Sequence, residues 1–180
     1  MTKRILAFGA STSSTSINKQ FAHDTANRIA GVEVTELDLR GYTLPIYSAD
    51  EEAANGVPAD ATRFLEAIQS HDGLVISLAE HNGSYAAAFK NLFDWSTRAE
   101  GKCWAEKPML LLATSPGERG GATVLAAALD RFPRHDGNIA ASFSLPSFND
   151  NLGPDGVSDP DLAADLNEAM AAFEAALTAE

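Results

Sequence analysis

Six hydroxyl side chains stand in a row near the beginning of the sequence. Residues 5–9 read Ile-Leu-Ala-Phe-Gly, and residues 11–16 read Ser-Thr-Ser-Ser-Thr-Ser before an amphipathic stretch begins. A turn from a strand into a helix gathers hydroxyls, backbone N–H groups and the positive end of the helix dipole, which is how proteins hold a phosphate. The pattern therefore predicts a phosphate-binding turn. The plain alternative is a hydrophilic loop in which Thr15 or Ser16 caps the helix.

A second polar turn follows the apolar run at residues 74–78 and reads Ala-Glu-His-Asn-Gly-Ser. Backbone amides and Asn82 could hydrogen-bond the polar edge of a flat ring, and Gly83 would let the main chain approach it closely. His81 could stack on such a ring or transfer a proton, although a lone loop histidine is usually a surface residue. The plain alternative is a strand-to-helix connection capped by Ser84.

The third turn follows the apolar run at residues 108–114 and reads Ser-Pro-Gly-Glu-Arg-Gly-Gly. Its glycines permit positive φ and close approach of the backbone to a ligand, although a flexible surface loop has the same composition. None of the three turns contains G-x-x-x-x-G-K-[ST] or G-x-G-x-x-G. We therefore predict neither a Walker loop nor a dinucleotide bound in the Rossmann manner.

The sequence offers no persuasive catalytic cluster and no metal site. Cys103 is the single cysteine, and no suitable His/Asp motif accompanies it as a nucleophile. The spacing of His23, His71 and His135 does not match a zinc site. Residues 149–156 lack the spacing and the closing glutamate of a calcium loop. We therefore predict no side-chain catalyst and no bound metal.

Short apolar runs alternate with amphipathic stretches along the chain. The three continuous runs named above are typical of strands buried on both faces. Alternation at residues 32–37 indicates a strand nearer the sheet edge, and residues 138–143 form a weaker fifth strand. Apolar periodicity predicts five helices, whereas residues 41–57 and the Asn-, Asp-, Gly- and Pro-rich stretch before Pro160 look like loops.

This alternation predicts an α/β protein with the flavodoxin-like three-layer sandwich, a five-stranded parallel sheet in the order 2-1-3-4-5. Ligands of such sheets bind beyond the carboxyl ends of the strands. The turns after strands one, three and four then lie side by side, so we expect the three unusual turns to converge. No repeat or linker interrupts residues 1–180, and we expect one domain.

Composition and charge narrow the class of protein. The chain has 180 residues, a hydrophobic fraction of 45% and a formal net charge of −12, so no basic footprint for nucleic acid is present. No apolar run reaches membrane-spanning length, and an acidic lipid surface would repel the chain. The first residues lead straight into a strand pattern, so we expect no signal peptide. Together with the single cysteine, this favours the cytoplasm.

The three turns together resemble the NADPH-dependent FMN reductase family, a flavodoxin-like group that includes quinone, chromate and azo-dye reductases. The opening pattern of that family, G-S-x-R-x-x-S-x-N, aligns with residues 10–18. Its second pattern, P-E-Y-N-G-S followed by K-N-x-x-D-W, aligns with residues 79–84 and 90–95, and S-x-G-x-x-G-G aligns with residues 115–121. The resemblance covers nearly the whole chain, and its second pattern is the most specific.

The resemblance implies which residues contact FMN. They are, around the phosphate, Ser11, Ser13, Ser16, Ile17 and Asn18; along the isoalloxazine, Glu80, His81, Asn82 and Gly83; and on the other side, Ser115, Gly117, Gly120 and Gly121.

Three positions depart from the family pattern. Ser13 replaces an arginine that pairs with the phosphate, Ala79 replaces a proline that stiffens the turn, and His81 replaces a tyrosine beside the flavin. The first change removes a charge-assisted contact worth roughly 1.5–3 kcal/mol. That loss corresponds to about one to two orders of magnitude in FMN affinity, of which neighbouring hydroxyls recover part.

The resulting hypothesis is an enzyme that passes hydride from NADPH or NADH to bound FMN and on to a quinone, a flavin or a similar small acceptor. The resemblance also implies a homodimer or homotetramer, with the helix bearing Phe89, Phe93 and Trp95 as a candidate interface. The alternative is a non-catalytic flavodoxin-like binding module with weak or altered FMN binding. A flavodoxin-type electron carrier is a third possibility, with a poorer match to the first turn.

Overall fold

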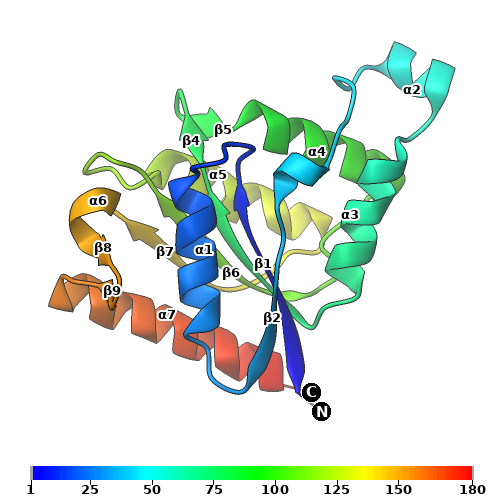
Figure 1. The fold of residues 1–180 in the computed structure, drawn as a ribbon. Coiled ribbons are helices and arrows are strands. Elements are labelled where there is room, and N and C mark those ends of the chain that lie inside the picture. The colour runs from blue at the N-terminus through cyan, green and yellow to red at the C-terminus, as the bar shows by residue number, and fades with distance from the viewer. Residues whose placement is uncertain (1, 180) are drawn as a thin grey trace.

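The central sheet has the strand order that the sequence predicts. The computed structural model describes residues 2–179. It contains one five-stranded parallel sheet in the order β2-β1-β3-β6-β7, which is 2-1-3-4-5 when only these strands are counted (Figure 1). The strands are β1 (Lys3–Ala10), β2 (Val32–Glu36), β3 (Gly73–Leu78), β6 (Pro108–Thr114) and β7 (Asn138–Leu145).

Helices cover both faces of the sheet and complete a three-layer sandwich. α1 and α7 pack on one face, and α3, α4 and α5 pack on the other (Figure 1). The helices are α1 (Ile17–Asn27), α2 (Ala49–Asn55), α3 (Ala59–Gln69), α4 (Ala87–Ala99), α5 (Ala122–Arg131), α6 (Phe148–Asn151) and α7 (Pro160–Thr178). Short 3-10 turns lie at Leu39–Gly41 (η1) and Phe132–His135 (η2). No helix within residues 2–179 combines the length and apolar character needed to cross a membrane.

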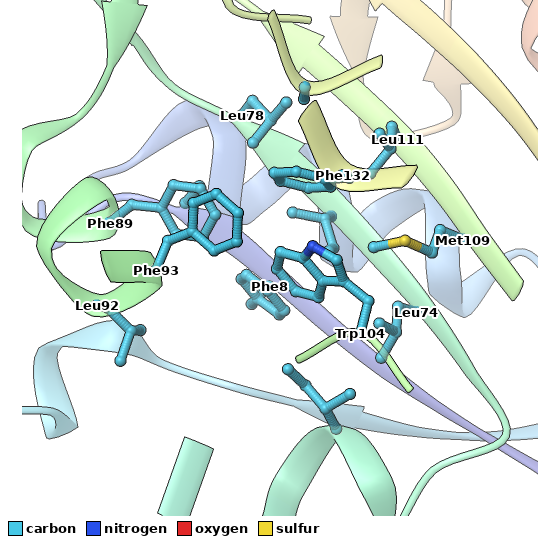
Figure 2. Close-up of a cluster of buried hydrophobic side chains, with 14 of the residues drawn as sticks. Phe8, Leu74, Leu78, Phe89, Leu92, Phe93, Trp104, Met109, Leu111 and Phe132 are labelled. Atoms are coloured by element: carbon cyan, nitrogen blue, oxygen red, sulfur yellow. The ribbon is translucent and has the colours of Figure 1, made fainter. Parts of the chain in front are cut away.

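The apolar runs are continuous because the central strands are buried on both faces. Along β1, Leu6 and Phe8 join the cluster beneath α3, α4 and α5, whereas Ile5 and Ala7 join the cluster beneath α1 and α7. Side chains on a strand alternate between faces, so apolar residues predominate on both sides of a strand whose two faces are covered. Figure 2 shows the first cluster, in which Trp104 lies among aromatic and aliphatic side chains.

The predicted loop over residues 41–57 is wrong in its middle, because α2 forms there. Ser48 is the N-cap of α2, and its hydroxyl accepts a hydrogen bond from the backbone N–H of Glu51 at 3.0 Å. Serine followed three residues later by glutamate is a capping-box signal. A helix is therefore encoded locally, although no residue of α2 is buried.

Residues 45–56, which include α2, form an arm that is held by α4. The carbonyl oxygen of Pro45 accepts hydrogen bonds from Asn91 Nδ2 and Trp95 Nε1, both at 2.8 Å. The rings of Tyr47 and Trp95 meet edge to face with centroids 5.0 Å apart. The arm extends away from the sheet (Figure 1), and its helix is also tied to α4 by an ion pair between Glu52 and Arg98 at 2.9 Å. Ile46 is 79% exposed.

The predicted loop before the last helix also contains regular structure. α6 and the small hairpin of β8 (Leu152–Gly153) and β9 (Gly156–Val157) occupy it. The last helix begins as predicted, with Asp159 as N-cap accepting from the backbone N–H groups of Asp161 and Leu162, both at 3.0 Å.

Gly9 lets α1 start against the sheet. A β-carbon at this position would overlap the backbone of Lys19 and lie 2.7 Å from the carbonyl carbon of Asn18. Both obstacles are main-chain atoms of α1, which cannot move aside as a flexible side chain would. The close approach of strand and helix therefore requires glycine.

We predict that Gly9→Ala lowers the free energy of unfolding by roughly 2–4 kcal/mol, because α1 must shift away from β1. The measurement is urea denaturation. Gly101→Ala is the matched control, since a β-carbon there has no neighbour within 4 Å, and it should change stability by about 0.5 kcal/mol or less. Equal midpoints for the two variants would contradict this prediction.

Candidate cofactor site

The three unusual turns converge at the carboxyl edge of the sheet. They surround an open hollow of about 370 Å³. Its lining comes from the β1–α1 turn, from the segment after β3 and from the end of β6. The lining residues are Ser11, Ser13, Thr15, Ser16, Ile17, Asn18, Ala79, Glu80, His81, Thr114, Ser115 and Pro116.

The β1–α1 turn is folded by its own hydroxyl groups. Ser11 Oγ accepts from the backbone N–H of Ser13 at 3.1 Å, and Ser16 Oγ accepts from the backbone N–H of Lys19 at 3.1 Å. Ser16 is thus the N-cap of α1 and lines the hollow as well. Among the described residues, no hydrogen bond occupies the backbone N–H of Ile17 or Asn18. Two main-chain donors at the positive end of α1 are therefore available to an anion.

The side chain of Asn18 already bonds within the protein. Its Oδ1 accepts from Ser77 Oγ at 2.7 Å and from the backbone N–H of Thr114 at 3.1 Å. Its Nδ2 donates to the carbonyl oxygen of Thr114 at 3.1 Å, and the residue is only 4% exposed. One buried amide thus fixes the start of α1 to β3 and β6. The resemblance places Asn18 at the phosphate, and in this geometry its backbone N–H is the group available for that role.

The second turn is a tight hairpin formed by β4 (Glu80–His81) and β5 (Ser84–Tyr85). Asn82 and Gly83 connect the two strands with φ of 53° and 72°. Two consecutive left-handed residues form a type I′ turn, for which Asn-Gly is a preferred pair. The Asn-Gly pair therefore shapes the hairpin, and neither residue lines the hollow.

Glu80 caps a helix that follows much later in the chain. Its Oε2 accepts from the backbone N–H of Val124 at 2.9 Å, in the first turn of α5. The N-cap of α5 is Gly121, which has no side chain to offer. A carboxylate at this end of a helix is stabilised by the helix dipole. Glu80 therefore joins the second turn to the third while it lines the hollow.

The third turn is held by the segment after β7. The backbone N–H of Phe148 donates to the carbonyl oxygen of Ser115, and that of Ser147 donates to the carbonyl oxygen of Gly117, both at 3.0 Å. Gly117 itself is exposed and lies outside the lining. The residues at the start of α6 therefore support this turn by main-chain bonds.

The two adjacent glycines of the third turn serve packing. Gly120 and Gly121 have φ of 57° and 77°. A β-carbon on Gly120 would overlap the Ser144 side chain and lie 2.9 Å from the carbonyl carbon of Leu145, whereas one on Gly121 would lie 3.1 Å from Ala113 Cβ. Both glycines are buried outside the hollow, where their freedom to adopt positive φ lets the turn press against β6 and β7.

The structure thus brings together most, and not all, of the predicted cofactor contacts. Those that line the hollow are Ser11, Ser13, Ser16, Ile17, Asn18, Glu80, His81 and Ser115. Those that lie outside its lining are Asn82, Gly83, Gly117, Gly120 and Gly121. The sequence reasoning left out Thr15, Ala79, Thr114 and Pro116, which also line it. Thr15 belongs to the hydroxyl run and Thr114 ends a buried strand next to the third turn, so the sequence positions of both residues could have identified them as lining residues.

Other reactive groups lie elsewhere. Cys103 is buried in the aromatic cluster beneath α4, and burial raises the pKa of its thiol to about 12. Phe89, Phe93 and Trp95 are at most 4% exposed, so the predicted interface face of α4 belongs to the core. Within residues 2–179, no group of three or more His, Cys, Asp or Glu side chains is arranged to hold a metal ion.

The sheet order and the hollow at its carboxyl edge define a flavodoxin-like protein. The family model of the NADPH-dependent FMN reductases matches residues 3–150. The chain therefore belongs to the NADPH-dependent FMN reductase family. This result confirms the resemblance carried by the three motifs.

Individual relatives match parts of the chain. It is 38% identical over 79 residues to a quinone reductase of Escherichia coli, an alignment that covers 44% of this chain and 42% of the relative. It is 30% identical over 120 residues to an NAD(P)H-dependent FMN reductase of Pseudomonas aeruginosa, covering 66% and 63%. Each alignment thus spans less than two thirds of the relative's own length.

A solved structure matches over nearly the full length of the chain. The flavoenzyme NAD(P)H:(acceptor) oxidoreductase FerB of Paracoccus denitrificans superimposes with a TM-score of 0.74 at 26% identity. That match covers 97% of each chain. The fold therefore resembles that of this flavoenzyme over nearly the whole length of both chains.

We predict that Asn18→Ala lowers the free energy of unfolding by about 2–4 kcal/mol, because it leaves Ser77 Oγ and the Thr114 N–H buried without their partner. Urea denaturation measures the loss. Ser13→Ala in the same turn is the control. The Ser13 side chain is exposed, so its loss should change the free energy of unfolding by about 0.5 kcal/mol or less. An unchanged midpoint for Asn18→Ala would show that the buried amide does not hold the turns together.

Proposed function

We propose that the chain binds FMN across the three turns and acts as an NAD(P)H-dependent oxidoreductase toward a small acceptor. The observation that carries the proposal is the pair of backbone N–H groups of Ile17 and Asn18, which have no hydrogen-bond partner among the described residues. Both residues belong to the first turn of α1 and line the same hollow as Ser11, Ser13 and Ser16. Such donors suit a phosphate, since they combine hydrogen bonds with the helix dipole.

The remaining lining suits the rest of the cofactor. Ala79 and Pro116 offer apolar surface, while Glu80, His81 and Ser115 offer polar groups. When bound, FMN supplies the redox chemistry, accepting hydride from NADPH or NADH and passing electrons to a quinone, a flavin or a similar acceptor. The protein then needs only to bind and orient both reactants, which agrees with a lining that contains no Cys and no Lys or Arg side chain among the described residues.

The direct test is to titrate the apo-protein with FMN and follow quenching of flavin fluorescence. We expect saturable binding, a yellow complex, bleaching by NADPH or NADH without oxygen, and recovery of colour when a quinone is added. A colourless protein that takes up no FMN at high concentration would contradict the proposal and support the non-catalytic binding module.

Removing the cap of α1 should weaken that binding. In Ser16→Ala the hollow loses a hydroxyl and α1 loses the bond to the Lys19 N–H, so we expect FMN affinity to fall about three- to tenfold. Ser48→Ala is the matched control, because Ser48 caps α2 through the same kind of bond and α2 lies outside the hollow. Equal FMN affinity of the two variants would place the phosphate elsewhere.

We also propose a homodimer or homotetramer, as the family resemblance implies, and a cytoplasmic location, which the single cysteine favours. The apolar face of α4 is buried within one copy, so exposed surfaces such as the α2 arm with Ile46 are better placed to contact a second copy. Light scattering on the purified protein tests the assembly. A mass near the 19.0 kDa of one chain would overturn this part of the proposal.

A further inference from the structure

Within the part of the chain that the structure describes, the hollow has no Lys or Arg side chain in its lining to meet an anionic ligand, and Glu80 adds a carboxylate. The whole chain carries a formal net charge of −12. A phosphate monoester has a charge of about −1.5 to −2 at neutral pH, whereas a helix N-terminus contributes only about half a positive charge. The main-chain donors therefore leave most of that charge unbalanced.

Lys19 is the basic residue next to these donors. It is the third residue of α1, and its backbone N–H bonds the cap hydroxyl of Ser16. Side chains on a helix lean toward the N-terminus, and lysine carries its charge on a flexible stem of four carbons. The side chain is 23% exposed, and its Nζ lies 3.0 Å from Asp38 Oδ2. The ammonium group is therefore held at the surface rather than locked in the core.

Asp38 has a second and stronger partner. Its carboxylate accepts from Arg40 Nε at 3.1 and 3.0 Å, from an Arg40 terminal nitrogen at 2.6 Å and from the Arg40 backbone N–H at 3.0 Å. Hydrogen bonding to Arg40 is the main reason that the pKa of the Asp38 carboxyl lies well below its usual range. If Lys19 leaves, Asp38 stays ionised and paired. Lys19 can therefore exchange Asp38 for another anion without leaving the Asp38 carboxylate unpaired.

We propose that Lys19 gives this site its preference for a phosphorylated flavin, by exchanging Asp38 for the phosphate of FMN when the cofactor binds. This inference rests on the proposed function. Lys19, which lies outside the lining of the hollow, then supplies the positive charge that the FMN phosphate needs. Asp38 competes with the phosphate for Lys19, so removing the Asp38 charge should strengthen FMN binding.

The test compares FMN with riboflavin, which lacks the phosphate, by fluorescence titration of each protein. In Lys19→Met we expect FMN affinity to fall about three- to tenfold and riboflavin affinity to stay within about twofold. Lys102→Met is the matched control. Lys102 Nζ pairs with Asp136 Oδ2 at 2.9 Å, and both residues precede the amino ends of strands β6 and β7, away from the hollow. This variant should therefore bind both flavins as the unaltered protein does.

Asp38→Asn provides the opposite change. It frees Lys19 and retains a side-chain oxygen for the Arg40 backbone N–H, so FMN affinity should rise about two- to fivefold. In the double variant with Lys19→Met this gain should vanish. If Lys19 had only a structural role, removing either partner of the ion pair would not change FMN affinity in opposite directions. Thermal unfolding of each variant verifies that it is folded.

The outcomes separate the two proposals. If the unaltered protein binds FMN and Lys19→Met binds it equally well, or if the gain from Asp38→Asn persists without Lys19, the role of Lys19 is overturned while the proposed function stands. If the unaltered protein binds neither flavin, the proposed function fails and this inference fails with it.

Discussion

A single buried amide, that of Asn18, decides whether the rest of the site exists. It joins the first turn of α1 to β3 and β6 through bonds to Ser77 and Thr114. Because Ser77 and Thr114 are buried, breaking these hydrogen bonds would leave their polar groups unpaired instead of bonded to water, which makes the connection costly to break. Ile17 and Asn18, whose backbone N–H groups are free among the described residues, line the hollow at this start of α1. Gly9 makes the connection possible by letting helix and strand come together.

The fold was readable because its signals are local. Continuous apolar runs mark strands with two covered faces, and the strand order then brings three separate turns to one edge. Asn82 and Gly83 specify their own hairpin by accessible backbone conformations. The helix at Ala49–Asn55 was equally local, since Ser48 and Glu51 encode its start, and attention to the capping pattern would have found it.

The internal partners of the site residues were not readable, because sequence spacing says nothing about them. Asn18 meets Ser77 across 59 positions and Thr114 across 96, and Glu80 meets Val124 across 44. The motifs therefore identified residues that matter without showing that some of them bond other loops. Gly120 is similar, since its glycine requirement comes from Ser144 and Leu145 on another strand.

The α2 arm has a consequence for motion. Its helix buries no side chain. The arm is attached to α4 by hydrogen bonds between its backbone and the side chains of Asn91 and Trp95, by an ion pair between Glu52 and Arg98 at 2.9 Å and by the packing of Tyr47 on Trp95. Segments with so few buried contacts open at a small fraction of the cost of global unfolding. Amide hydrogens of α2 should thus exchange with deuterium long before those of the central strands, because local opening of the arm leaves the buried contacts of the sheet in place.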